Sequence, residues 1–240
     1  MNKKIRIYFS DKIQSDLVAH LKKEQSHYLK DVMRLKIGDA FSIFNNKGEW
    51  KASIQNYEKQ SVKIKILEKL RDKKNENNIW LAFTPIKKNP LNFIIQKGTE
   101  LGVQKFIPIL SERTVVKDIN AERIKKVIIE SAEQSNRISI PEITKLETLK
   151  NFISSFPQEG CLVFCDINCD KNNLKNILSK KNLGPICLLI GPEGDFSENE
   201  RKLIIDLKQS KPISLAKNIL RAETAALVAL TLVNYHLNLS

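Results

Sequence analysis

The order of hydrophobic and polar residues divides the chain into two parts with different periodicities. Before residue 71, short apolar segments alternate with polar ones, and lysines occupy every second position within residues 62–66. A period of two is typical of a β-strand with one buried face. Further segments of strand length read IRIYF, AFSIF and EWKASIQ, and the turn sequence NNKGE joins the last two. We therefore predict a small, barrel-like β domain with one or two short helices between Gln14 and Leu35.

After residue 78, apolar runs of strand length alternate with helical segments. The strand candidates read IWLAFT, KFIPIL, CLVFC, ICLLI and PISL. Helices are predicted to begin near Pro90, Ala121, Lys171, Ser197 and Arg221. Ser197 and Glu200 have the spacing of a helix capping box. This alternation predicts a mostly parallel sheet covered by helices. The polar run RDKKNENN predicts a linker, so the expected domains are residues 1–72 and 73–240.

Composition and charge narrow the class of protein. Hydrophobic residues make up 42% of the 240 residues and charged residues 28%, as in ordinary globular proteins. The net charge is +13, and residues 1–70 hold 15 Lys and Arg against 8 Asp and Glu. This excess favours a polyanionic partner such as nucleic acid, bound mainly by the β-rich part. Lysines on a solvated sheet face explain the same excess equally well.

Cysteine spacing and apolar runs exclude several classes. The four cysteines contain no CxxC pair, so no metal site is expected and reduced thiols are favoured. The longest apolar runs fall well short of the roughly 20 residues that a bilayer requires. The N-terminus lacks the apolar core of a signal peptide. We therefore expect a cytoplasmic protein without a membrane segment.

The sequence LLIGPEGDFSENE, at residues 188–200, places glycines directly after a predicted buried strand. In open α/β sheets, ligands bind beyond the carboxyl ends of the strands, where glycines let the backbone approach them closely. Neither a GxGxxG fingerprint nor a P-loop is present, so neither a dinucleotide site nor a P-loop is supported. An ordinary turn between a strand and a helix explains the same residues.

Two other regions combine charged residues with element ends. In ISLAKNILRAETAALVAL, at residues 213–230, Arg221 and Glu223 precede an apolar helix that must be buried in the core or at a subunit interface. A helix cap with an ion pair is the structural alternative. The segments KGTELGVQKFIPILSERTVVK and ESAEQSNRISIPEI carry a dense polar set, which an ion-pair network would also explain.

The chain resembles the ribosomal RNA small subunit methyltransferase E family of the SPOUT superfamily. The resemblance lies in five motifs that occur in this order: KGTELGV, SERTVVK, EQSNR with the following IPEI, LLIGPEGDFS and ILRAETAAL. The segments IRIYF and HYLKDVMRLKIGD resemble the PUA-like domain of that family. The resemblance extends from about Arg6 to Leu230, which is nearly the whole chain.

This resemblance implies a trefoil-knotted α/β domain of the SPOUT type, preceded by a small PUA-like β-barrel that binds RNA. It also implies a homodimer that binds S-adenosyl-L-methionine and methylates N3 of a uridine in 16S ribosomal RNA, near the decoding centre and within the small subunit. The implied cofactor-binding residues are Thr84, Ile190, Gly191, Pro192, Glu193, Gly194, Leu215, Ala216, Ile219, Leu220 and Arg221.

The reaction requires a base for the N3 proton and a cation for the developing uridine anion. We assign Arg221 and Glu223 as the catalytic pair, with Glu193 as the other carboxylate beside the pocket. The expected RNA-binding residues are Arg6, His27, Arg34 and Arg137.

The chain departs from the family pattern at several positions. The stretch usually read as L-G-P-R-[IV]-L-R is LAKNILR at residues 215–221, so its Gly, Pro and first Arg are replaced. Asn136 stands for a usual glycine, and it still tolerates a positive φ. Asp195 replaces the second glycine of GPEGG, where we expect its carboxylate in the first turn of a helix.

Two alternatives therefore remain open. One is a ribosome-assembly factor of the same fold that binds RNA but is catalytically weak or inactive. The other is a SPOUT enzyme acting on transfer RNA or on a ribose hydroxyl.

Overall fold

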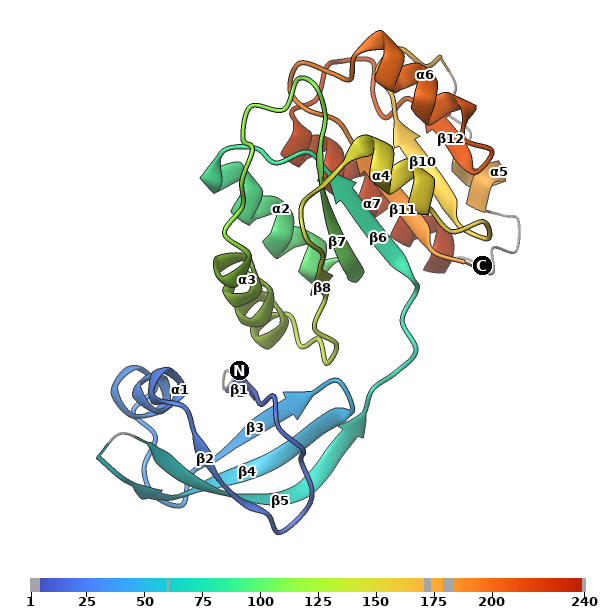
Figure 1. The fold of residues 1–240 in the computed structure, drawn as a ribbon. Helices are drawn as coiled ribbons and strands as arrows, with labels where there is room; N and C mark the ends of the chain where they lie inside the picture. The colour runs from blue at the N-terminus through green and yellow to red at the C-terminus, as the bar shows by residue number, and fades with distance from the viewer. Residues whose placement is uncertain (1–4, 60, 171–173, 179–183, 239–240) are drawn as a thin grey trace. The chain divides into compact units, whose positions relative to one another are not determined.

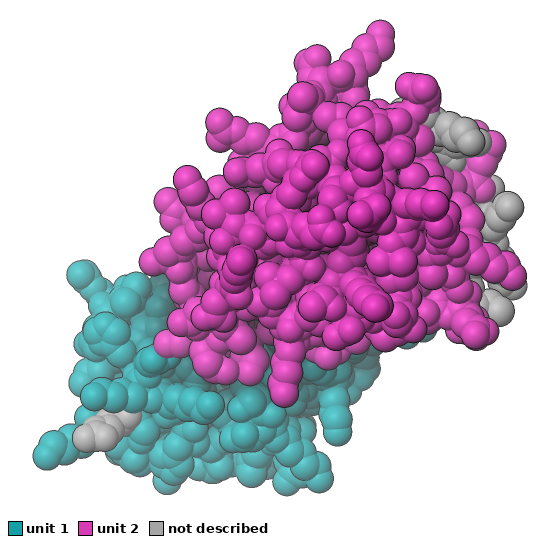
Figure 2. Space-filling view, turned by 45° about the horizontal axis from the view of Figure 1, so that its top comes forward, with its two compact units in different colours: residues 1–75, 132–140 teal, residues 76–131, 141–240 magenta. Residues whose placement is uncertain are grey.

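A computed structural model describes residues 5–59, 61–170, 174–178 and 184–238 of the chain (Figure 1). The chain forms two compact units. Unit 1 comprises residues 1–75 and 132–140, and unit 2 comprises residues 76–131 and 141–240 (Figure 2). The change of unit after residue 75 falls close to the expected boundary between residues 72 and 73. Residues 132–140 join unit 1 although they lie far along the chain.

Unit 1 is built on a five-stranded sheet with the strand order β1-β3-β4-β5-β2. Its elements are β1 (Arg6–Tyr8), β2 (Val18–Leu21), α1 (Lys23–His27), a single π-helical turn (Tyr28–Val32), β3 (Ala40–Asn45), β4 (Gly48–Tyr57) and β5 (Val62–Asp72). The predicted hairpin is confirmed, since β3 and β4 pair antiparallel up to Asn45 and Gly48. Strand β5 continues through the first two residues of the predicted linker, which therefore begins at residue 73.

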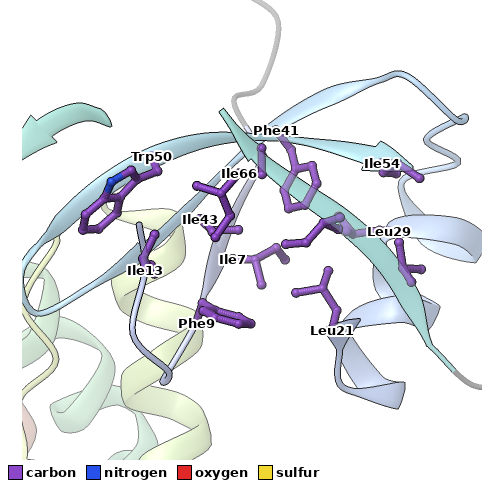
Figure 3. Close-up of a cluster of buried hydrophobic side chains, with 13 residues drawn as sticks. Ile7, Phe9, Ile13, Leu21, Leu29, Phe41, Ile43, Trp50, Ile54 and Ile66 are labelled. Carbon is purple, nitrogen blue, oxygen red and sulfur yellow. The ribbon is translucent and has the colours of Figure 1, made fainter. Parts of the chain in front are cut away.

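The core of unit 1 follows from the period of two in its strands. Val62, Ile64 and Ile66 of β5 are fully buried, whereas the lysines between them are only half-buried. Figure 3 shows side chains of β1, β3, β4 and β5 directed into one interior, together with Leu29 and residues before α1. Burial of each large apolar side chain contributes about 1.5–3 kcal/mol, so this alternation stabilises the sheet.

Unit 2 contains a parallel sheet with the strand order β12-β10-β11-β6-β7-β8, and β9 also pairs with β7. Its strands are β6 (Ile79–Phe83), β7 (Val103–Leu110), β8 (Glu142–Ile143), β9 (Glu147–Thr148), β10 (Cys161–Cys165), β11 (Ile186–Ile190) and β12 (Ser210–Ile213). Its helices are α2 (Lys88–Glu100), α3 (Ala121–Gln134, whose last three residues belong to unit 1), α4 (Leu149–Ser155), α5 (Leu174–Leu178), α6 (Glu198–Asp206) and α7 (Ala222–Asn238).

Helices cover both faces of this sheet (Figure 1). Side chains of α4 and α6 pack with Leu162, Cys187 and Leu189 on one face. Helix α7 contacts β11 and α2 contacts β7, and these two helices also contact each other. The mostly parallel α/β architecture and the preceding β domain predicted from the sequence are therefore confirmed. The trefoil knot stays a prediction.

Helices α2, α3, α6 and α7 begin within two residues of the predicted positions, whereas α4 was not predicted. Helix α2 begins two residues before Pro90, with Lys87 as its N-cap, and Pro90 is tolerated because first-turn N–H groups need no intrahelical acceptor. The helix start predicted near Lys171 lies outside the described residues. Within the described residues, no helix is both long and apolar enough to cross a membrane.

Candidate cofactor and substrate site

Three predicted cofactor segments lie at one edge of the unit 2 sheet. Thr84 follows β6, the GPEGD turn (residues 191–195) follows β11, and the LAKNILR loop (residues 215–221) follows β12. Because β12, β10, β11 and β6 are neighbours in a parallel arrangement, their carboxyl ends share this edge. The backbone N–H of Thr84 donates to the carbonyl of Ile190 at 3.3 Å. The structure thus brings together segments that are more than 100 residues apart.

The GPEGD turn is anchored by the aromatic residue that follows it. The ring of Phe196 is buried and packs edge-on against that of Phe164, with ring centroids 5.7 Å apart. A Cβ atom at Gly191 would lie 2.9 Å from the Phe196 ring, which is closer than real Cβ contacts allow. Gly191 is therefore required by packing, in addition to any approach of its backbone to a ligand.

Asp195 closes the turn in the left-handed region, with φ 59°. Its backbone N–H donates to the carbonyl of Pro192 at 2.9 Å, and its carboxylate accepts from the N–H of Phe196 at 2.8 Å. The expectation that Asp195 lies in the first turn of a helix is wrong, because α6 begins only at Glu198 with Ser197 as its N-cap. An Asp tolerates this backbone conformation better than most residues because its side chain bonds locally.

The capping box predicted at the start of α6 is confirmed, and it has an additional role. Ser197 Oγ accepts from the N–H of Glu200, whose Oε2 accepts from the N–H of Ser197. The other oxygen of Glu200 accepts from the backbone N–H of Glu112 at 2.8 Å. The loop that follows β7 is thereby fixed to the N-terminus of α6.

Arg113, in the same loop, is a residue of this edge that the sequence did not single out as a site residue. Its Nη1 donates to the carbonyl of Gly194 at 2.8 Å, and its side chain lies 3.8 Å from where a Cβ of Gly194 would be. The sequence indicated that the charged SERT segment belongs to a dense polar set, but it did not show which of its charged side chains contacts the GPEGD turn.

The LAKNILR loop presents both polar and apolar side chains. Leu215 and Leu220 are half-buried and Ala216 is exposed, whereas Ile219 is 82% exposed. An isoleucine with that exposure leaves a large apolar surface in water, and binding of an apolar ligand or a protein surface would cover it.

Arg221 and Glu223 flank the start of α7. Arg221 is exposed and its carbonyl accepts from the N–H of Ala225 at 2.8 Å, while Glu223 is half-buried in the first helical turn. Within the part of the chain that the structure describes, neither side chain has a hydrogen bond or an ion pair. The ion pair of the structural alternative is therefore not formed between them. Glu193 is also exposed and without a described partner.

Thr84 carries the strongest indication of a ligand at this edge. The residue is 1% exposed, and its Oγ1 has no hydrogen-bond partner among the described residues. A buried hydroxyl without a partner costs about 1–3 kcal/mol, and a bound polar ligand would remove that cost. Pro192 and Ile190 complete the predicted set, half-buried and buried respectively.

The predicted RNA-binding residues of unit 1 fall into two groups. His27 and Arg34 are exposed, and His27 Nδ1 lies 2.6 Å from Asp31 Oδ2. Arg34 adopts a left-handed backbone with φ 55°. Arg137 instead is buried, and its Nε donates to Ser139 Oγ at 2.8 Å.

Arg6 is also buried, which corrects the expectation that it contacts RNA. Its guanidinium donates to the carbonyls of Ala132, Glu133 and Arg137, lies 4.2 Å from the centre of the Phe44 ring, and has its Nε 3.4 Å from Glu49 Oε1. Burial lowers the pKa of the Arg6 guanidinium, and the carboxylate of Glu49 counteracts this. The side chain is thus used inside unit 1, and almost none of it is available to a ligand.

Comparison with known proteins gives the class of this chain. Residues 73–234 match the family described as RNA methyltransferase domain, and residues 21–67 match the RNA methyltransferase PUA domain. The chain therefore contains an RNA methyltransferase domain preceded by a PUA domain.

Relatives along the full length identify the family more narrowly. Ribosomal RNA small subunit methyltransferase E from Rickettsia conorii is 32% identical over 228 residues, which cover 94% of this chain and 93% of that protein. The protein of the same name from Bacillus subtilis is 31% identical, covering 90% and 89%. The chain belongs to the ribosomal RNA small subunit methyltransferase E family.

Solved structures agree with this assignment. Ribosomal RNA small subunit methyltransferase E from Neisseria gonorrhoeae, bound to S-adenosyl methionine, superposes with a TM-score of 0.85 at 26% identity and covers 97% of both chains. A putative methyltransferase from Legionella pneumophila, also in complex with this cofactor, gives a TM-score of 0.86 at 28% identity with the same coverage.

Proposed function

We propose that this protein transfers the methyl group of S-adenosylmethionine to N3 of a uridine in 16S ribosomal RNA, near the decoding centre of the small subunit. The observation that carries the proposal is the shared carboxyl edge of β6, β11 and β12, from which Thr84, the GPEGD turn and the LAKNILR loop follow, together with the buried Thr84 hydroxyl that has no hydrogen-bond partner among the described residues. Membership of the methyltransferase E family and the cofactor bound by two relatives support it.

The residues at this edge suit the cofactor. Backbone groups of residues 190–194 and 215–221 can hold the adenine and ribose, and the exposed Ile219 offers an apolar surface for the base. Thr84 Oγ1 supplies a polar contact that no described protein group uses. When bound, the cofactor supplies an electrophilic methyl group, and positioning accounts for much of the acceleration of its in-line transfer.

The nucleophile must lose a proton, because uridine N3 carries one. Glu223 acts as the base, and Arg221 stabilises the negative charge that develops on the uridine. Both side chains have no described partner, so no ion pair has to break before they act. Glu193 is the remaining carboxylate of the edge.

Unit 1 contributes the RNA contacts. Residues 1–70 have an excess of seven basic over acidic residues, and phosphate neutralisation dominates such interfaces. Among the predicted RNA contacts of this unit, the exposed side chains are those of His27 and Arg34. Arg6 and Arg137 support the unit from inside.

The protein is proposed to act as a knotted homodimer in the cytoplasm. Along α7, Leu227, Val228 and Leu232 are half-buried and Tyr235 is 61% exposed, so this apolar helix is only partly covered within the chain. A second copy would cover the remainder. Sedimentation equilibrium is expected to give twice the mass of the chain, and a monomer would contradict the dimer.

Two measurements test the activity. Calorimetric titration with S-adenosylhomocysteine is expected to show one site per chain, and absence of heat would favour the inactive assembly factor. Small subunits from a strain that lacks the gene are expected to accept one labelled methyl group, recovered as N3-methyluridine. Glu223→Gln and Arg221→Ala are each expected to lower kcat about 100-fold, and Glu223→Gln is expected to leave the affinity for S-adenosylhomocysteine within about threefold of wild type. Unchanged kcat would remove these residues from the mechanism.

A further inference from the structure

The segment that follows β10, residues 166–169, lies between the two cofactor loops. Strand β10 is flanked by β11 on one side and β12 on the other, and all three run parallel. The GPEGD turn follows β11 and the LAKNILR loop follows β12. The separation of the two loops therefore depends on what occupies the space after β10.

This segment is hydrogen-bonded to both neighbours. Towards β12, the N–H of Asp166 donates at 2.9 Å to the carbonyl of Ile213, which is the last residue of that strand and lies two residues before the LAKNILR loop. Towards β11, Asn168 Nδ2 donates to Asp195 Oδ2 at 3.0 Å, within the GPEGD turn. Residues 166–169 thus form a short bridge between the GPEGD turn and the end of β12, from which the chain continues into the LAKNILR loop.

The buried carboxylate of Asp166 joins the bridge to its surroundings by hydrogen bonds. Asp166 is 1% exposed, and its Oδ2 accepts from Arg201 Nε at 3.0 Å and from Arg201 Nη2 at 2.7 Å. Its Oδ1 accepts from the backbone N–H of Asn168 at 2.9 Å, which fixes the side chain that reaches Asp195. Arg201 lies on α6, so the bridge is also fixed to the helix that follows the GPEGD turn.

The backbone of Asp195 has a φ of 59°, a conformation that glycine adopts without strain. Here the carboxylate holds the turn by accepting from Asn168 and from the N–H of Phe196. A hydrogen-bonded aspartate therefore holds this turn in a backbone conformation that glycine would adopt without strain.

We infer that Asn168 and Asp195 are positioning residues for the cofactor, and that their hydrogen bond sets the separation of the GPEGD turn and the LAKNILR loop. This inference rests on the proposed function. Neither residue is required to touch the reacting atoms, so loss of the bond raises KM for S-adenosylmethionine while kcat at saturating cofactor is retained.

The test uses the full-length protein and S-adenosylhomocysteine as the calorimetric probe. Asn168→Ala is expected to weaken binding of the probe about fivefold, the effect of one hydrogen bond. KM for S-adenosylmethionine is expected to rise about fivefold, with kcat and KM for the small subunit within about twofold of wild type. Gln209→Ala is the matched control, because it removes an amide hydrogen bond to the carbonyl of Gln158 at the opposite end of the sheet.

An exchange of the two side chains separates positioning from general stability. Asn168→Asp places two carboxylates against each other. It is expected to weaken probe binding more than tenfold, which is at least twice the fivefold loss expected for Asn168→Ala. The double variant Asn168→Asp with Asp195→Asn restores one donor and one acceptor, and its affinity is expected to return to within about threefold of wild type. Asn also tolerates the backbone of position 195.

Wild-type affinity and KM in Asn168→Ala, or failure of the exchange to restore binding, would overturn the positioning role while leaving the proposed function intact. Absence of probe binding by the wild-type protein would instead overturn the proposed function, and the positioning role with it.

Discussion

Glu200 Oε1 accepts a hydrogen bond from the backbone N–H of Glu112 across 88 residues of sequence, while the same carboxylate caps α6. One side chain therefore fixes both the helix that follows the GPEGD turn and the loop from which Arg113 reaches Gly194. Its substitution should affect two segments at once.

Glu200→Ala is expected to lower the free energy of unfolding by about 1–2 kcal/mol, because the capping box and the bond to Glu112 are both lost. Native-state hydrogen exchange should show faster exchange of the Glu112 and Ser197 amides. The exposed Glu198→Ala in the same helical turn is the control, with an expected loss below about 0.5 kcal/mol. Unchanged exchange at Glu112 would contradict the second role.

Thr84→Val is expected to raise stability and weaken cofactor binding. Replacing an unpartnered buried hydroxyl by a methyl group of similar size should increase the free energy of unfolding by about 0.5–1 kcal/mol. Affinity for S-adenosylhomocysteine should fall about fivefold if Oγ1 contacts the ligand. Thermal unfolding and calorimetry measure the two effects.

Thr99→Val provides the control for that experiment. Thr99 is equally buried, but its hydroxyl donates to the carbonyl of Ile95 at 2.8 Å. The substitution is expected to lower stability and leave affinity unchanged. A loss of stability in Thr84→Val would show that its hydroxyl is satisfied within the protein.

The buried carboxylate of Glu49 stabilises unit 1 by pairing with two arginines. It faces Arg6 at 3.4 Å and Arg71 at 2.6 Å. Glu49→Ala leaves Arg6 buried without its carboxylate and is expected to cost about 3–5 kcal/mol. Urea unfolding followed by tryptophan fluorescence in a Trp80→Phe background reports on unit 1, because Trp50 is then the sole tryptophan.

Glu122→Ala removes the exposed pair with Lys125 and is the control, with an expected change below about 1 kcal/mol. A Trp50 transition that does not move in Glu49→Ala would refute the role of the buried pair.

The thiols of Cys165 and Cys187 are expected to be much less reactive than an ordinary thiol. Burial raises the pKa of Cys165 to about 12 and raises that of Cys187 further. The thiolate is the reactive form, and a raised pKa disfavours it at every pH below that value. Alkylation of Cys165 should therefore increase about tenfold per pH unit between pH 8 and 11, without the plateau near pH 9 of an ordinary thiol.

Peptide mass spectrometry after brief iodoacetamide treatment at pH 8 should find little modification of Cys165 in the folded protein and extensive modification after unfolding in urea. Equal labelling of Cys165 in the folded and in the urea-unfolded protein would contradict its raised pKa.

Local chemistry made part of the site predictable. The capping box of Ser197 and Glu200 depends on residues three positions apart, and the positive φ of Asn136, observed at 62°, depends on one residue type. Apolar sequences likewise predicted strands β6, β7, β10, β11 and β12 of the parallel sheet, whereas the two-residue strands β8 and β9 were not predicted.

Contacts across long sequence separations could not be predicted in this way. Arg6 was expected at an RNA surface because an arginine near a strand end carries no sign of its partners, which lie 126–131 residues away. The bridge from Asn168 to Asp195 was missed for the same reason. The parallel pairing of β10 with β11 brings the segments after both strands to the same edge, where the two side chains form their hydrogen bond.

Unit 1 includes residues 132–140 from the middle of the chain. This has consequences for folding during translation and for the exchange of domains between relatives. During translation, the first 75 residues emerge before the carbonyls that receive the Arg6 guanidinium have been synthesised. The hairpins of the N-terminal sheet can form early, but the buried hydrogen bonds of Arg6 can form only after residues 132–140 have been synthesised. A chimera that exchanges N-terminal domains between relatives must therefore transplant both pieces together.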